Sequence, residues 1–130
     1  MKRAEWIWLI ALACPLLFGI FYSGSHRSPR APMKSALAQI GSFKTGLEMF
    51  KDDNGDFPRN LNAMIIKPTN ASTNWHQYFD KIPLDPWGRP YLYVYPGKHN
   101  TNSFDLSSAG PDRIPGTADD IVNWPAQQER

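Results

Sequence analysis

Three aspartates near the C-terminus are the side chains whose type and spacing best support chemistry. Asp112, Asp119 and Asp120 lie in a segment interrupted by two glycines and two prolines between residues 110 and 116. Such a backbone can turn tightly enough to bring residues seven and eight positions apart to one point. Oxygen ligands without a nearby histidine or cysteine suit a hard cation, and Ca²⁺ accepts carboxylates and backbone carbonyls in a flexible shell. The segment therefore predicts a calcium site, with a solvated acidic turn as the alternative because surface turns are rich in Asp, Gly and Pro.

No other group of side chains in the sequence has the spacing of a catalytic or metal site. The three histidines, His26, His76 and His99, are isolated in linker and loop segments without a partner at metal-ligand spacing. The sequence contains no GxSxG, HExxH or GxxxxGK string, and Cys14 lies within an apolar run. We therefore expect no enzymatic activity and no small-molecule substrate.

Length and composition restrict the chain to one compact domain with an appendage. It has 130 residues, of which 42% are hydrophobic, and this is enough for one folded core. The net charge is only +2, and the basic residues form no stripe interleaved with aromatics, so we expect no nucleic-acid partner. Twelve prolines and nine glycines indicate much turn and irregular structure, which favours an α+β fold over a helical bundle.

The apolar run Trp6–Tyr22 predicts a transmembrane helix. Its seventeen uncharged residues would span about 26 Å as an α-helix, which is just enough to cross a bilayer core. Lys2 and Arg3 precede the run and no clean small-x-small cleavage site is present, so we expect an uncleaved anchor rather than a removed signal peptide. We interpret residues 1–22 as the anchor and residues 23–34, which are polar, basic and proline-containing, as a linker.

Residues 35–130 are expected to form the folded domain. Apolar residues at three- and four-residue steps predict a helix with one buried stripe, capped by Ser35 and ending near Asp52–Gly55; the stripe consists of Ala36, Ile40, Phe43, Leu47 and Phe50. Alternating aromatic and aliphatic residues and short apolar runs predict a small antiparallel sheet. Its strands are expected at Tyr91–Tyr95, Ser103–Ser107 and Ile121–Trp124, after a helical turn at Leu61–Ile65 and a turn at Pro83–Gly88.

Four segments of the domain resemble one family when they are taken together and in order. They are the helix end Met49–Pro58, the turn and strand Leu84–Tyr93, the segment Phe104–Asp112 and the string Ala118–Ile121. This combination resembles the C-terminal domain of the major, or G-type, pseudopilin of type II secretion systems. The resemblance covers about residues 35–124, and its specificity comes from the order of the segments because none of them is distinctive alone.

The resemblance implies a fold, a cofactor and a cellular role. The fold would be pilin-like, with an N-terminal helix packed on a small antiparallel sheet, a C-terminal calcium loop and a preceding transmembrane helix. The calcium ligands would be the side chains of Asp112, Asp119 and Asp120 and the carbonyl oxygens of Ala109 and Ile114. The protein would be a structural component of the secretion apparatus, anchored by a single pass in the inner membrane with its domain in the periplasm, and its partners would be the membrane and other pseudopilins.

The N-terminus departs from the pattern of that family. Its members begin with a short basic leader, a glycine and then Phe-Thr-Leu-x-Glu before the apolar helix, whereas this chain has no Gly-Phe-Thr-Leu string. Glu5 precedes the apolar run, but a glutamate at a helix N-terminus is also favoured by the macrodipole. The alternative function is therefore a solitary membrane-anchored, calcium-dependent binding module of the cell envelope that does not polymerise.

Overall fold

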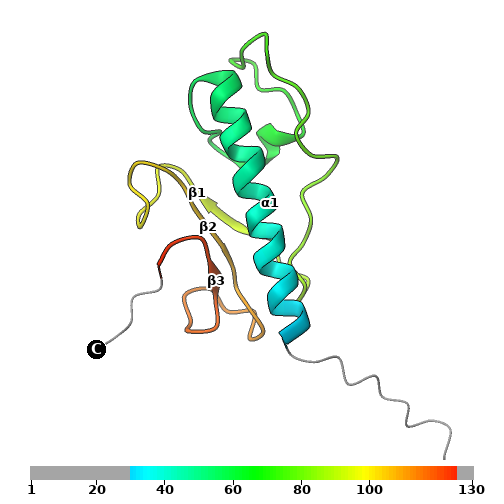
Figure 1. The fold of residues 1–130 in the computed structure, drawn as a ribbon, viewed down its shortest axis with the longest axis vertical. Helices are drawn as coiled ribbons and strands as arrows, with labels where there is room; N and C mark the ends of the chain where they lie inside the picture. The colour runs from blue at the N-terminus through cyan, green and yellow to red at the C-terminus, as the bar shows by residue number, and fades with distance from the viewer. Residues whose placement is uncertain (1–29, 126–130) are drawn as a thin grey trace, which may run out of the picture.

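The computed structural model describes residues 30–125. The expected anchor Trp6–Tyr22 lies outside the described residues. Within residues 30–125, no helix combines the length and the apolar character needed to cross a membrane. The described part consists of one long helix, a short 3-10 helix and a three-stranded sheet, joined by extended loops (Figure 1).

Helix α1 spans Arg30–Asn54 and buries the predicted apolar stripe. It begins before the expected cap Ser35, so the prediction that residues 30–34 belong to a linker is wrong. The reason is Pro32, which lies in the first turn, where backbone N–H groups have no intrahelical acceptor and a proline therefore loses no hydrogen bond. At the other end Gly55 adopts a φ of 87°, and its N–H donates to the Lys51 carbonyl at 2.7 Å. This left-handed residue ends the helix in the predicted place.

The sheet has three antiparallel strands in the order β1-β2-β3. Strand β1 spans Leu92–Val94, β2 spans Asp105–Ser108 and β3 spans Ile121–Val122. All three overlap the predicted segments. In the register, Tyr93 lies opposite Leu106, and Ser108 lies opposite Ile121, so these four residues share the face of the sheet that packs on the helix.

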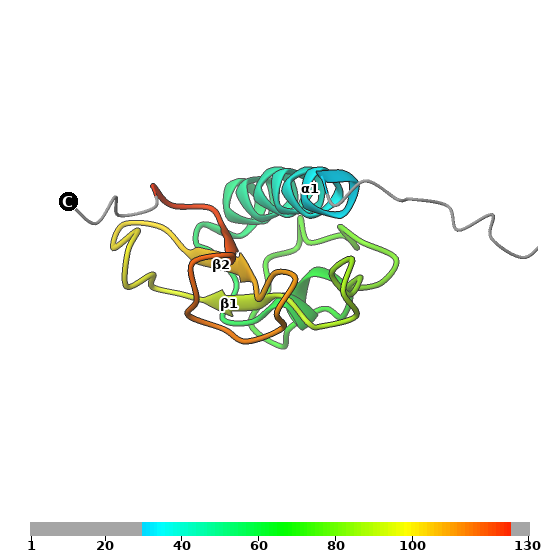
Figure 2. The same cartoon turned by 90° about the horizontal axis from the view of Figure 1, so that it is seen from below.

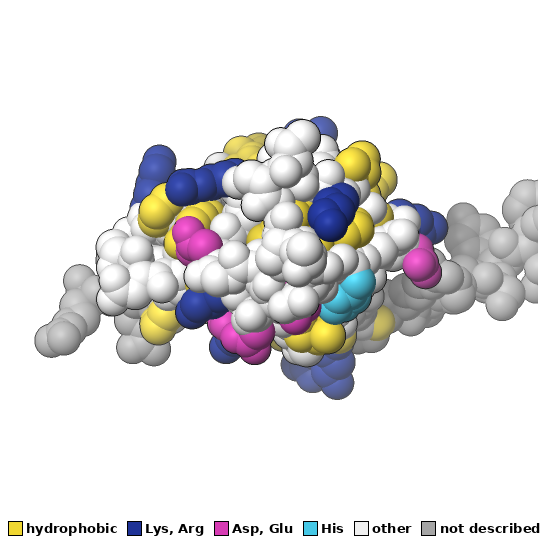
Figure 3. All heavy atoms as spheres, turned by 90° about the horizontal axis from the view of Figure 1, so that it is seen from above, with side chains coloured by type: hydrophobic (Ala, Val, Ile, Leu, Met, Phe, Trp, Pro, Cys, Tyr) yellow, Lys and Arg dark blue, Asp and Glu magenta, His cyan; other side chains and the backbone are white. Residues whose placement is uncertain are grey.

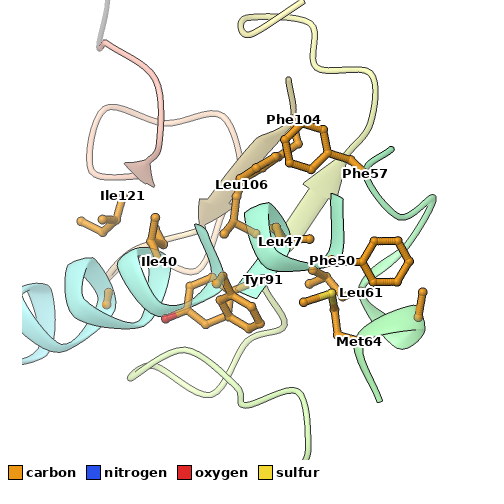
Figure 4. Close-up of a cluster of buried hydrophobic side chains, with 13 residues drawn as sticks. Ile40, Leu47, Phe50, Phe57, Leu61, Met64, Tyr91, Phe104, Leu106 and Ile121 are labelled. Carbon is orange, nitrogen blue, oxygen red and sulfur yellow. The ribbon is translucent and has the colours of Figure 1, made fainter. Parts of the chain in front are cut away.

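The core lies between α1 and this face of the sheet. Figure 2 shows the helix as one layer and the sheet with its loops as the other. The Phe43 ring on α1 contacts the Tyr91 ring with centroids 5.2 Å apart, and the Phe57 and Phe104 rings contact each other at 5.1 Å. Burial raises the pKa of Tyr91 to about 12, with the Asp85 carboxylate adding to the shift. The buried side chains in Figure 4 come from the helix, the 3-10 segment, the strands and the residues that flank them.

The segment between the helix and the sheet packs around the C-terminal end of α1. The 3-10 helix η1 spans Leu61–Met64 and is capped by the Asn60 side chain, which accepts a hydrogen bond from the Ala63 N–H at 3.3 Å. Further along the chain, the Tyr78 hydroxyl donates to the Asp53 carboxylate at 2.8 Å. Burial and then this hydrogen bond raise the pKa of Tyr78 to about 12. These contacts tie a long irregular segment to the helix.

Candidate metal centre

The predicted metal loop, residues 109–120, is connected on its N-terminal side to the turn between Pro83 and Gly88. Asp85 is buried in that turn, where its Oδ1 accepts hydrogen bonds from the Trp87 N–H at 3.0 Å and the Arg89 N–H at 2.8 Å. Its Oδ2 accepts a third hydrogen bond from the Ser108 hydroxyl at 2.6 Å. The Ser108 oxygen in turn accepts from the Gly110 N–H at 3.2 Å. A buried polar chain therefore holds the first residues of the loop.

On its C-terminal side the loop is held by the side chain of Asn123. Its Oδ1 accepts from the Leu106 N–H at 2.8 Å, and its Nδ2 donates to the Phe104 carbonyl at 3.0 Å. The Asn123 N–H also donates to the Leu106 carbonyl at 3.0 Å. These bonds continue the ladder of the sheet beyond β3. The residues that leave the loop are thus fixed to the same strand, β2, as the residues that enter it.

Asp105 organises the hairpin between β1 and β2, beside the exit of the loop. Its carboxylate accepts hydrogen bonds from the N–H groups of Lys98, His99 and Asn100 at 2.7 to 2.9 Å. The Nδ1 atom of His99 lies 3.0 Å from Oδ2 of the same carboxylate. The imidazole of His99 stacks on the Trp124 indole with ring centroids 4.2 Å apart. This set of contacts ties the end of the described chain to the hairpin.

Inside the loop, Asp119 and Asp120 each have two hydrogen-bond partners, and the Thr117 hydroxyl is common to both. The Oδ2 atom of Asp119 accepts from the Asp112 N–H at 3.0 Å, and its Oδ1 accepts from the Thr117 hydroxyl at 2.6 Å. Asp120 is linked to the same hydroxyl at 3.5 Å and accepts from the Gly116 N–H at 2.8 Å. The structure therefore brings Asp119 and Asp120 to one threonine oxygen and brings the backbone of Asp112 to Asp119.

The other predicted ligands are the Asp112 side chain and the carbonyl oxygens of Ala109 and Ile114. The Asp112 carboxylate accepts from the Ile114 N–H at 2.8 Å, and the Ile114 carbonyl oxygen lies 3.1 Å from the same Thr117 hydroxyl oxygen. Ala109 is buried at the start of the loop. Among residues 30–125, no set of three or more His, Cys, Asp or Glu side chains is arranged to hold a metal ion. The three carboxylates share one loop, but they do not converge on one point.

The donor chemistry of the loop fits a hard cation. The side chains and carbonyls of its predicted ligands offer only oxygen atoms, which Ca²⁺ prefers. The hydrogen bond from the Thr117 hydroxyl, followed by the one from the Asp112 N–H, holds the pKa of Asp119 below its usual value. This carboxylate is therefore ionised at neutral pH, as a calcium ligand must be.

Sequence reasoning missed the role of Thr117 and, although it counted Gly110 among the turn residues, did not reveal the contact that requires a glycine there. Thr117 bridges two of the aspartates, and its position two residues before Asp119 is the pattern of a local side-chain hydrogen bond. Gly110 adopts a φ of 66°, and a Cβ atom there would lie 2.3 Å from the Asp119 carbonyl oxygen. The glycine thus permits the two ends of the loop to approach each other, and only the three-dimensional contact reveals this requirement.

The family follows from comparison with known proteins. A family model described as type II secretion system (T2SS), protein G, matches residues 25–124. The chain belongs to this family. Its resemblance to the type II secretion pseudopilin is therefore confirmed over the helix, the sheet and the loop 109–120.

Individual relatives and a solved structure agree with this result. The type II secretion system core protein G of Escherichia coli K12 is 36% identical over 123 residues, covering 89% of this chain and 79% of the relative. The core protein G of Pseudomonas aeruginosa is 38% identical over 108 residues, covering 75% of each chain. The crystal structure of the major pseudopilin from enterohaemorrhagic E. coli superposes with a TM-score of 0.63 at 33% identity, covering 73% of this chain and 88% of that chain.

Membership in this family defines the fold and the class of function. The pilin-like arrangement of one long helix on a small antiparallel sheet is confirmed. The type II secretion pseudopilin is a structural component of the secretion apparatus in the cell envelope, and the partners of this chain are other components of that apparatus.

Proposed function

We propose that this type II secretion pseudopilin is anchored by one transmembrane helix in the inner membrane and stabilised by Ca²⁺ bound to its periplasmic domain. The observation that supports the calcium site best is the closed loop 109–120. Asp119 and Asp120 are linked there to one hydroxyl group, and Asp119 also accepts from the backbone of Asp112. Both ends of the loop are attached to β2 through Ser108 and Asn123. The carboxylates therefore need to turn only locally to meet one ion.

Calcium would be held by the side chains of Asp112, Asp119 and Asp120 and by the carbonyl oxygens of Ala109 and Ile114. Its charge would offset the repulsion among three carboxylates in one short loop. Because the folded loop would bind the ion and the unfolded chain would not, binding stabilises the fold by RT ln(1 + [Ca²⁺]/Kd), or about 2.7 kcal/mol at a hundredfold excess over Kd. The subunit would thus reach full stability only outside the cytoplasm, and its role would be structural rather than catalytic.

The calcium proposal predicts an ion-dependent melting temperature. The full chain in detergent should melt higher in Ca²⁺ than in chelator, and Asp119→Asn should remove most of this difference. The asparagine keeps one oxygen acceptor for the Thr117 hydroxyl, but its NH2 group cannot accept from the Asp112 N–H. In chelator the variant should therefore lose about 0.5–1.5 kcal/mol, the usual net contribution of one hydrogen bond. Differential scanning calorimetry with and without calcium measures both effects.

Asp80→Asn is the matched control for this experiment, because Asp80 is an exposed acidic residue outside the loop. The control should retain the full calcium response. Equal melting temperatures of the unchanged protein in calcium and in chelator, with no heat of binding on titration, would mean that the loop is a solvated acidic turn. A response that survives Asp119→Asn would place the ion elsewhere.

The anchor proposal predicts that Trp6–Tyr22 remains on the protein in the cell. The run is long enough to span a bilayer core and has no convincing signal-peptidase site. Membrane fractionation followed by mass spectrometry of the N-terminus tests this expectation. A soluble form that begins near Ser23 would contradict it. A terminus that is cleaved and methylated would indicate pseudopilin processing, whereas an intact Met1 would favour the alternative of a solitary anchored binding module.

A further inference from the structure

Six residues give one end of the domain an exposed surface that is both apolar and basic. Four of them, Arg30, Met33, Lys34 and Leu37, recur at three- and four-residue steps and therefore form one stripe on the first two turns of α1. Met33 is 40% exposed and Leu37 is 55% exposed. The other two, Arg113 and Ile114, lie at the tip of the loop 109–120, where Ile114 is 58% exposed. We call these six residues the basal surface.

Both parts of the basal surface lie at the end of the domain where α1 begins. In Figure 1 the first turns of α1 and the orange to brown loop after β2 occupy the lower part of the molecule. Seen from below, both face the viewer (Figure 2). The backbone of Arg113 has a φ of 63°, and its N–H donates to the Gly110 carbonyl at 3.2 Å. This turn holds the tip of the loop in place.

The chain itself brings this end close to a bilayer. Only residues 23–29 separate the apolar run Trp6–Tyr22 from the first residue of α1. Seven residues span at most about 25 Å when fully extended. If Trp6–Tyr22 is the anchor, as proposed above, the basal surface is the part of the described domain that is tethered nearest to the membrane.

We propose that the basal surface docks on an anionic membrane surface, and this proposal rests on the anchor proposed above. Arg30, Lys34 and Arg113 would face the lipid phosphates, and Ile114 and Leu37 would enter the headgroup region. Basic and apolar side chains that are exposed together are the usual composition of a membrane-contacting surface. Docking would fix the orientation of the domain relative to its anchor before assembly.

The acidic residues of the loop make calcium a modulator of this docking. Asp112, Asp119 and Asp120 offset the three basic side chains of the basal surface, because they lie in the same loop as Arg113. An ion bound to them would leave an excess of positive charge at this end. Docking should therefore be stronger in calcium and weaker at high salt, which screens charges at exposed sites.

The opposite end of the domain provides a matched control. Figure 3 looks at that end and shows apolar, basic and acidic side chains interspersed. Ile66, which follows η1 after the helix has ended, is 69% exposed. It has the same residue type as Ile114 and similar exposure, but it follows η1, which lies beside the C-terminal part of α1 (Figure 1). A probe at this position should not meet a membrane that the basal surface contacts.

An environment-sensitive fluorophore on the full chain in nanodiscs tests the proposal. The chain would carry Cys14→Ser and either Ile114→Cys or Ile66→Cys, labelled with a nitrobenzoxadiazole dye, at one copy per disc. Discs of phosphatidylglycerol and of phosphatidylcholine would be compared, each in calcium and in chelator. A blue shift and a gain in emission at position 114, confined to phosphatidylglycerol and absent at position 66, is the expected result. Arg113→Glu combined with Lys34→Glu should reduce the shift.

Three outcomes would overturn the docking proposal. The first is no shift at position 114 in any disc, and the second is an equal shift in both lipids. The third is a shift that is absent at one copy per disc and appears only when discs are loaded with several copies. The last would indicate contact between subunits. A rise in melting temperature with calcium in the same samples is recorded separately. A rise in melting temperature without a dye shift would support the calcium site and contradict docking. A dye shift in chelator without a rise in melting temperature would support docking and contradict the calcium site. Recovery of the chain in the soluble fraction would instead contradict the anchor on which the docking proposal rests.

Discussion

Replacing Gly110 with alanine should destabilise the domain by about 2–5 kcal/mol. A left-handed backbone costs a residue with a Cβ atom about 1–2 kcal/mol, and overpacking adds about 1–3 kcal/mol. The second contribution applies because the new Cβ atom would lie 2.3 Å from the Asp119 carbonyl oxygen, which belongs to the backbone and cannot rotate away. Urea unfolding of the purified chain measures the loss. The same variant should also lose its calcium response, since the loop can no longer close.

Gly116→Ala separates the two causes. Gly116 also has a positive φ, 88°, but a Cβ atom added there would have nothing within 4 Å, so this variant should lose only the backbone contribution of about 1–2 kcal/mol. A loss as large for Gly116→Ala as for Gly110→Ala would mean that the contact with Asp119 is unimportant. The closed geometry of the loop 109–120 would then be incorrect.

Asp105→Ala should be among the most damaging single substitutions in the domain, with a loss of about 3–5 kcal/mol. The change removes the acceptor of three backbone N–H groups, from Lys98, His99 and Asn100, in a partly buried hairpin. Each donor left without a partner costs about 1–3 kcal/mol where water cannot replace the lost acceptor. It also frees the His99 ring that stacks on Trp124. Loss of ordered signals from residues 97–100 and 121–125 in NMR spectra would accompany the lower stability.

Asp105 should also make the domain sensitive to acid. Burial by itself would raise the pKa of this carboxyl, but hydrogen bonds from His99, Asn100 and Lys98 outweigh burial and hold the pKa below its ordinary value of 3.8. Because the folded-state pKa is the lower one, the contribution to stability is fully present above pH 3.8 and is lost as the pH falls through the folded-state pKa. Urea unfolding at a series of pH values should show a shallower acid slope for Asp105→Asn than for the unchanged chain.

Asp52→Ala is the control for both measurements on Asp105, because Asp52 is an exposed aspartate at the end of α1. Its removal should change the free energy of unfolding by less than about 0.5 kcal/mol, as is usual for exposed positions. An Asp105→Ala variant that is as stable as this control would show that the hairpin does not depend on the buried carboxylate.

Local patterns in the sequence were sufficient to predict the main elements. The stripe from Ala36 to Phe50 repeats every three or four residues, and these residues are buried on α1. The alternation around Tyr93 predicted β1, and the predicted strand near Ile121 is β3. Such predictions succeed because the period of the apolar residues is a property of neighbours along the chain. The start of the helix was misjudged because Pro32 breaks a helix interior but is tolerated in its first turn.

For the candidate site, too, local features could be predicted from the sequence and long-range contacts could not. The sequence by itself determined that Asp112, Asp119 and Asp120 share a turn-rich oxygen-only loop, because residue type and spacing are local. Tertiary structure alone decided that Ser108 joins Asp85 to the entrance of the loop and that Asn123 attaches its exit to β2. These bonds connect residues 23 and 17 positions apart in the chain. Hydrogen bonds of that range depend on how the sheet is paired, and no periodicity or short motif encodes the pairing.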